Sequence, residues 1–141
     1  MVLHIDLFVI SMDVMLDFYV GKLGMAKIDD QIITGDLVRF ISRGNYDAYR
    51  LVLLKVAATG AMIELMEYVT TNKPQAKQES INPITIALLT PCLEKKINEL
   101  SEKDVLPVSS IFEVELKNAG KSKIIFYSDP ENNLIEYLQV T

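Results

Sequence analysis

Three residue types that often carry structure or chemistry are scarce in this sequence. It has one cysteine, Cys92, one histidine, His4, and no tryptophan in 141 residues. A single thiol cannot form an internal disulfide or a thiolate metal cluster. This scarcity argues against a disulfide-stapled secreted scaffold and against a cysteine-rich zinc site, and it fits a reducing compartment.

Long apolar runs and clusters of positive charge are also missing. No apolar stretch approaches the roughly 18 to 20 residues that a membrane span requires, and His4 and Asp6 interrupt the apolar N-terminal segment. The formal net charge is −5, which disfavours binding to phosphate backbones. We therefore expect a cytoplasmic protein with no nucleic-acid partner and no membrane partner.

What the sequence does contain is enough apolar material for a core. Half of the 141 residues are hydrophobic, which suffices for one domain or for two small fused modules. Alternation in the first segment places Leu3, Leu7 and Val9 among an inward row that also includes Ile5. The other face of the same predicted strand carries the more polar row of residues 4, 6, 8 and 10.

The first half of the chain predicts a strand, a helix and then several strands. The helix begins at Ser11 or Asp13, either of which suits a cap, and it ends at Gly24. Strands are expected at 3–10, 25–34, 37–42, 49–56 and 61–68.

The second half repeats this order after a polar linker at 70–82. Its helix is expected to begin with Thr90 as cap and Pro91 in the first position. Strands are expected at 84–89, 105–108, 112–116, 123–127 and 134–140. The sequence therefore predicts an α+β fold of two tandem βαβββ modules, at 1–69 and 83–141.

Matching segments support this duplication. The strand around Glu64 matches the strand around Glu136, and the segment starting at His4 matches the segment starting at Pro83. The two matches are offset differently along the chain, which a longer loop in the first module absorbs.

The last strand contains an unusual carboxylate. Asp129-Pro130 followed by two asparagines is typical of a tight turn, so the strand at 134–140 should return beside the strand before it. Glu136 then lies in an apolar row, where burial without a partner is costly. The face that carries Glu136 must border a wet cleft, or the carboxylate must have a cation.

These segments together resemble the vicinal oxygen chelate superfamily, which includes glyoxalases, bleomycin-resistance proteins, extradiol dioxygenases and methylmalonyl-CoA epimerases. The resemblance is carried by His4, the Phe18-Tyr19…Leu23-Gly24 helix, the Ile63-Glu64-Leu65 strand and the Asp129-Pro130…Ile135-Glu136 ending. It implies that each module forms a curved sheet and that the two modules form a cup with the site on its concave floor. It also implies a homodimer.

In metal-using members of that family, four side chains from the first and last strands of each module bind one divalent ion. The resemblance places His4, Glu64, Pro83 and Glu136 at these positions. His4, Glu64 and Glu136 are suitable ligands for Zn²⁺, Ni²⁺, Fe²⁺ or Mn²⁺. Pro83 has no side-chain atom that can bind a metal. The second module therefore supplies a ligand at only one of its two positions, Glu136.

Each of these residues also has a purely structural interpretation. A lone histidine near the start of a strand is commonly a structural residue. Glu64 and Glu136 are then carboxylates on edge strands, paired with lysine or arginine.

Two functions remain open at this stage. One is a small-molecule binding protein of the bleomycin-resistance type, with a degenerate or metal-free site. The other is a metal-dependent lyase or isomerase, in which the ion holds two neighbouring substrate oxygens, an enediolate is stabilised, and Glu136 or Glu64 moves a proton. Pro83 favours the binding protein.

Overall fold

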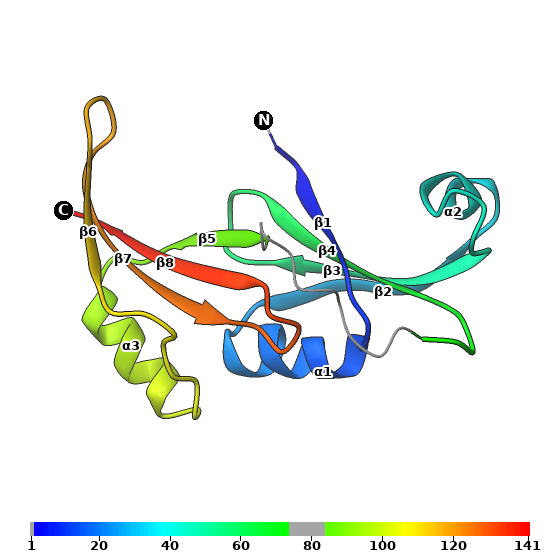
Figure 1. The fold of residues 1–141 in the computed structure, drawn as a ribbon, viewed down its shortest axis with the longest axis horizontal. Coiled ribbons are helices and arrows are strands. Elements are labelled where there is room, and N and C mark those ends of the chain that lie inside the picture. The colour runs from blue at the N-terminus through cyan, green and yellow to red at the C-terminus, as the bar shows by residue number, and fades with distance from the viewer. Residues whose placement is uncertain (1, 74–83) are drawn as a thin grey trace. The chain divides into compact units, whose positions relative to one another are not determined.

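The computed structural model describes residues 2–73 and 84–141 (Figure 1). Its contacts divide the chain into two compact units, Met1–Lys77 and Gln78–Thr141. The predicted linker at 70–82 falls mostly outside the described residues, and so does Pro83.

The first unit is a four-stranded mixed sheet with helices. Its strand order is β1-β4-β3-β2, with β1 parallel to β4 and the other neighbours antiparallel. Its elements in chain order are β1 (His4–Phe8), α1 (Met12–Leu16), the π-helical turn η1 (Asp17–Lys22), β2 (Ala26–Thr34), α2 (Asp36–Ile41), β3 (Ala48–Lys55) and β4 (Met62–Tyr68).

The second unit repeats this topology with order β5-β8-β7-β6, again with one parallel pair, β5 and β8. Its elements are β5 (Thr85–Leu89), α3 (Leu93–Ser101), β6 (Phe112–Leu116), β7 (Gly120–Ser128) and β8 (Leu134–Val140). Both units are βαβββ modules, and the predicted α+β class is confirmed. In the described segments no helix has the length and apolar character to cross a bilayer.

The sheet of the first module buries one face. Met12 and Met15 of α1 are fully buried together with alternate strand residues such as Leu65. Leu7 and Val9 of the predicted inward row are buried, but Leu3 and Ile5 of the same row are exposed, Leu3 by 63% and Ile5 by 46%. The prediction fails at these two positions, of which Leu3 precedes β1 and Ile5 lies near its first residue.

Two predicted strands are absent. Residues 37–42 fall largely in helix α2, which follows Gly35 at a φ of +101°, a conformation that glycine adopts easily. Val38 and Ile41 are one helical turn apart and pack into an apolar cluster, so burial outweighed the strand propensity of this run. Residues 105–108 are not a strand because Pro107 has no N–H to donate to a ladder.

The two main helices begin in a way the sequence did not predict. Neither has a local side-chain cap. Instead Glu67 Oε2 accepts the Met12 N–H at 2.9 Å, and Gln139 Oε1 accepts the Leu93 N–H at 2.6 Å. Thr90 is therefore not the cap of α3, and its hydroxyl donates to the Cys92 carbonyl.

The turn before β8 has the predicted structure. The buried Asp129 carboxylate accepts hydrogen bonds from the backbone N–H groups of Glu131 and Asn133 and from the Asn133 side chain. Asn132 takes a φ of +65°. The turn returns β8 antiparallel beside β7, as predicted.

Candidate functional site

Each sheet has an open face, defined here as the face opposite α1 or α3. In the second module, the Lys96 ammonium of α3 lies 5.6 Å from the ring centroid of Tyr137. Side chains alternate along a strand, so the adjacent Glu136 points to the open face. In the first module Leu65 is buried, and Glu64 points to the open face by the same argument.

Three polar side chains meet at one end of the open face of the first module. His4 Nε2 lies 3.2 Å from Asp6 Oδ1 and 3.9 Å from Glu64 Oε2. One donor atom from each residue fits within a mutual distance of 4.8 Å. We call His4, Asp6 and Glu64 the acidic end.

The strand register explains this arrangement. Asp6 pairs directly with Glu64 across the parallel β1–β4 ladder, and His4 lies two residues before Asp6 on the same face. The structure thus brings the predicted residues His4 and Glu64 together. It adds Asp6, which the alternation of β1 had already placed on the same face as His4 but which was not proposed as a ligand.

Glu64 is the most buried member of the acidic end. Its side chain is 15% exposed, against 38% for His4 and 47% for Asp6. Burial raises the pKa of Glu64, the nearby Asp6 charge raises it further, and His4 opposes the rise. The carboxylate is therefore held in a less polar environment than its surface neighbours.

Two apolar side chains lie next to the acidic end, and the charged residues Lys55 and Asp29 are their register neighbours. Leu53 is the register partner of Glu64 on β3, and both Leu53 and Met62 are partly buried. Apolar side chains beside a few converging polar groups are the usual composition of a small-molecule site.

The other end of this open face is covered by an aromatic group and α2. The Tyr68 ring stacks on the rings of Phe8 and Tyr46, with centroid distances of 5.1 Å and 4.2 Å. The Tyr49 ring contacts Tyr68 edge-on, with a centroid distance of 6.3 Å. Val38 of α2 joins the same buried cluster. We call Phe8, Tyr46, Tyr49 and Tyr68 the aromatic end.

Tyr49 of the aromatic end has a shifted pKa. Burial raises the pKa of Tyr49, and the charges of Glu64 and Asp6 raise it further.

Among its described residues the second module has no counterpart of the acidic end. Leu134 and Glu136 of β8 pair with Thr85 and Ala87 of β5, as Met62 and Glu64 pair with His4 and Asp6 in the first module. Thr85 therefore holds the place of His4, which corrects the match to Pro83. The two-residue shift keeps the same face of the strand.

The interpretation of Glu64 and Glu136 as edge-strand carboxylates is wrong. β4 lies between β1 and β3, and β8 lies between β5 and β7, so both strands are internal. Glu136 faces Ala87 on one side and Phe126 on the other. It is an ionisable group in an apolar row, as the sequence indicated.

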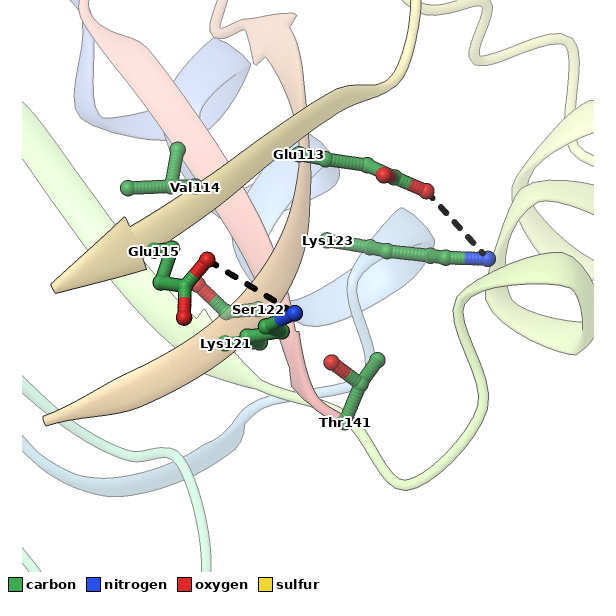
Figure 2. Close-up of a pocket in the computed structure, with 7 residues that line it drawn as sticks. All are labelled: Glu113, Val114, Glu115, Lys121, Ser122, Lys123 and Thr141. Atoms are coloured by element: carbon green, nitrogen blue, oxygen red, sulfur yellow. Dashed lines mark ion pairs between the residues drawn. The ribbon is translucent and has the colours of Figure 1, made fainter.

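A separate pocket of about 470 Å³ lies on the β6–β7 hairpin, where the side chains in Figure 2 line it. Lys121 Nζ is 3.6 Å from Glu115 and Lys123 Nζ is 3.9 Å from Glu113. These residues are directly opposite in the antiparallel ladder. The charges of the pocket are thus used in cross-strand pairs, which explains them as a stabilising feature of the hairpin.

Comparisons with known proteins agree with this fold. A family model described as the Glyoxalase/Bleomycin resistance protein/Dioxygenase superfamily matches residues 2–137. No curated protein sequence matches the chain.

Three solved structures illustrate the likeness. A glyoxalase family protein from Bacillus cereus has a TM-score of 0.72 at 13% identity, covering 97% of this chain and 91% of the other. The trypanothione-dependent glyoxalase I of Leishmania major has a TM-score of 0.65 at 18% identity, covering 99% and 86%. The antibiotic binding protein TnmS3 from Streptomyces sp. CB03234 has a TM-score of 0.61 at 18% identity, covering 100% and 96%.

Identities this low carry the fold alone, but the family model covers nearly the whole chain. The chain belongs to the glyoxalase/bleomycin resistance protein/dioxygenase superfamily.

Proposed function

We propose that this protein binds a small organic molecule at the acidic end of the first module without requiring a metal. The observation that carries the proposal is the convergence of His4, Asp6 and Glu64 beside the partly buried side chains of Leu53 and Met62. The second module offers Thr85 and Ala87 at the equivalent positions, so its half of the family's ligand set is reduced to Glu136.

The chemistry of the acidic end suits a ligand with hydrogen-bond donors. Asp6 and Glu64 accept hydrogen bonds, and the reduced exposure of Glu64 strengthens any bond made to it. Leu53 and Met62 provide apolar contact area beside these groups. The fold shared with the antibiotic binding protein TnmS3 supports this class of function.

A metal-dependent lyase or isomerase is the second candidate, and one observation favours it. His4, Asp6 and Glu64 present an imidazole and two carboxylates within 4.8 Å, which are ligand types for Zn²⁺, Ni²⁺, Fe²⁺ or Mn²⁺. A bound ion supplies Lewis-acid polarisation of neighbouring substrate oxygens. Glu64 is the proposed proton-transfer group, and we retain Glu136 as a proposed ligand and proton-transfer group from the second module.

A fragment titration followed by amide NMR tests the binding function. We expect a set of small ring compounds carrying amine or hydroxyl groups to shift amide signals in β1, β3 and β4, next to Asp6, Leu53 and Glu64. Asp6→Asn should weaken the binding, whereas the control Glu113→Gln on the β6–β7 hairpin should not. Shifts confined to other parts of the chain would reject the proposal.

Metal analysis decides between the two candidates. The protein is purified without chelator, its ions are counted, and it is then titrated with Ni²⁺, Fe²⁺, Mn²⁺ and Zn²⁺. If an ion binds the folded state, stability should rise by about 2.7 kcal/mol at a hundredfold excess over Kd, and Glu64→Gln should abolish the rise. An unchanged Tm with all four ions eliminates the metal-dependent function.

A further inference from the structure

We propose that residues 35–47, which contain α2, form a wall that limits the size of the ligand at the acidic end. The inference rests on the proposed binding function and adds a size class to it. The expected ligand is a compact molecule, about the width of a single ring. Tyr46 is the proposed specificity-determining residue of this wall.

The wall distinguishes the first module from the second. β2 and β3 are joined by α2 and the loop after it, whereas residues 117–119 alone connect β6 to β7. Figure 1 shows α2 at the end of the β2–β3 hairpin and a bare turn at the end of the β6–β7 hairpin. The same sheet topology thus carries an additional element on one module only.

The open-face positions that α2 covers are uncovered in the second module. By strand register, Phe8 and Tyr68 correspond to Leu89 and Val140. Leu89 is 75% exposed and Val140 is 63% exposed, whereas Phe8 and Tyr68 are partly buried and pack against the cluster of Val38, Tyr49 and Met66. The difference follows from α2 and its loop.

The wall is held firmly in place. Val38, on the packed side of α2, is fully buried. Ser42 Oγ accepts the Tyr46 N–H at 3.0 Å and donates to the Tyr46 carbonyl at 3.1 Å. Gly35 N–H donates to the Asp47 carbonyl at 3.2 Å and closes the base of the segment. The Tyr46 ring is therefore fixed on Tyr68 by its backbone as well as by stacking.

The wall meets the sheet near the carboxylates, because Val38 of α2 packs in one cluster with Met66 of β4. Phe8 lies two residues beyond Asp6 on β1, and Met66 lies two residues beyond Glu64 on β4. Two residues of strand span about 7 Å. A ligand bound to Asp6 and Glu64 therefore meets the aromatic end after roughly the width of one six-membered ring.

Two amines with one and three fused rings test the wall. Benzylamine and 9-(aminomethyl)anthracene carry the same cationic group, which suits Asp6 and Glu64, and their Kd values are measured by NMR titration. One variant replaces residues 35–47 with a two-residue Asn-Gly turn. A second variant, Tyr46→Ala, alters the wall in a chain of full length, and Tyr46→Phe is its matched control.

We expect the shortened chain to bind the anthracene amine about tenfold or more tightly than the unchanged protein, with less than about a twofold change for benzylamine, because the additional rings gain apolar contact. Tyr46→Ala should give a smaller gain and Tyr46→Phe none. Asp6→Asn in the shortened chain should remove the gain, which shows that the probe is anchored at the acidic end.

The proposal is overturned if neither wall variant binds the anthracene amine more tightly than the unchanged protein does. A gain that survives Asp6→Asn also overturns it, because the probe then adheres to newly exposed apolar surface. If the shortened chain does not fold, Tyr46→Ala alone decides the result. The fragment titration of the unchanged protein tests the binding function and does not depend on the wall variants. Failure of the wall proposal can therefore be distinguished from failure of the binding function.

Discussion

The two modules share one backbone frame and differ on their open faces. In the first, the Val9 N–H donates to the Met66 carbonyl beside β1, and in the second the Thr90 N–H donates to the Leu138 carbonyl beside β5. Glu67 and Gln139 start the two helices in the same way. Residues that set the frame have kept their roles after duplication.

The open faces have diverged in both charge and cover. His4 and Asp6 have Thr85 and Ala87 as their counterparts, while Glu64 and Glu136 are alike. The first module also has α2, for which the second module has only a short turn. The comparison teaches that the helix-facing side of each sheet maintains the fold, and that the open side is where the modules acquired different chemistry.

The largest effect is expected from a substitution that destabilises the fold of the second module alone. Asp129→Ala removes a buried carboxylate that accepts three hydrogen bonds in the turn before β8. We expect a loss of about 3 kcal/mol in the free energy of unfolding, measured with urea. Asn132→Gly, at a φ of +65°, is the control and should change stability by less than about 1 kcal/mol. A loss below about 1 kcal/mol for Asp129→Ala would contradict the role assigned to this turn.

Smaller effects are expected at the ion pairs made by two equivalent basic residues, Arg50 and Lys123. Arg50 and Lys123 hold equivalent positions, because Arg50 pairs with Glu67 and Lys123 pairs with Gln139. Arg50 donates two hydrogen bonds to Asp30 at 2.9 Å, whereas Lys123 is 3.9 Å from Glu113. We expect Asp30→Asn to cost about 1–2 kcal/mol and Glu113→Gln less than about 0.5 kcal/mol. Equal losses in urea unfolding would show that the two pairs are equivalent.

The pH dependence of the Asp30 variant gives an internal check. The hydrogen bonds from Arg50 are the main cause that holds the pKa of Asp30 well below its ordinary value. A carboxyl group with a depressed folded-state pKa stabilises the fold above its unfolded pKa, and this contribution is lost as the pH falls toward the folded value. The stability difference between wild type and Asp30→Asn should therefore shrink below about pH 4.

The caps should have similar effects in the two modules. Glu67→Ala removes the acceptor for Met12, and Gln139→Ala removes the acceptor for Leu93. Each substitution should cost about 1 kcal/mol, measured by urea unfolding and by amide exchange at the start of each helix. Loss of exchange protection at the start of one helix only would show that the duplicated caps do not contribute equally.

The smallest effect concerns the open face. Burial is the main cause that raises the pKa of Glu64, so its charged form is disfavoured by folding. A carboxyl group with a raised pKa lowers stability as the pH rises from the unfolded pKa through the folded one. Glu64→Gln should therefore increase the free energy of unfolding at pH 7 by less than about 1 kcal/mol. The increase is measured as a higher Tm. The gain should vanish near pH 4.

Glu136→Gln is the matched variant in the second module. Its register neighbours are Ala87 and Phe126, so no carboxylate corresponding to Asp6 lies beside it. We expect a smaller change in Tm than for Glu64→Gln. A larger change in Tm for Glu136→Gln than for Glu64→Gln would contradict this expectation.

Much of the frame could be predicted because its signals are local. Gly24 ends the first helical segment with a φ of +77°, and the Asp129 turn follows from its own side chains. Alternation of apolar residues placed β3, β4 and β8 within about one residue of their observed bounds. These features depend on neighbours in sequence, which a single chain displays.

The failures at α2 and at the two helix caps involve partners distant in sequence. Helix α2 formed in a strand-prone run because Val38 found Tyr49 and Met66 to pack against. The caps of α1 and α3 come from the last strand of each module, more than forty positions away. No local pattern contains such information.

The candidate site divides in the same way. The sequence alone determined that a histidine and carboxylates lie on strand faces of two duplicated modules, because strand alternation and the repeat are written in the order of residues. Only the tertiary structure decided that Asp6 joins His4 and Glu64, that Thr85 is the counterpart of His4, and that α2 covers the aromatic end. The physical reason is that ladder register and packing are set by contacts between segments, and these contacts exist only when the chain is folded.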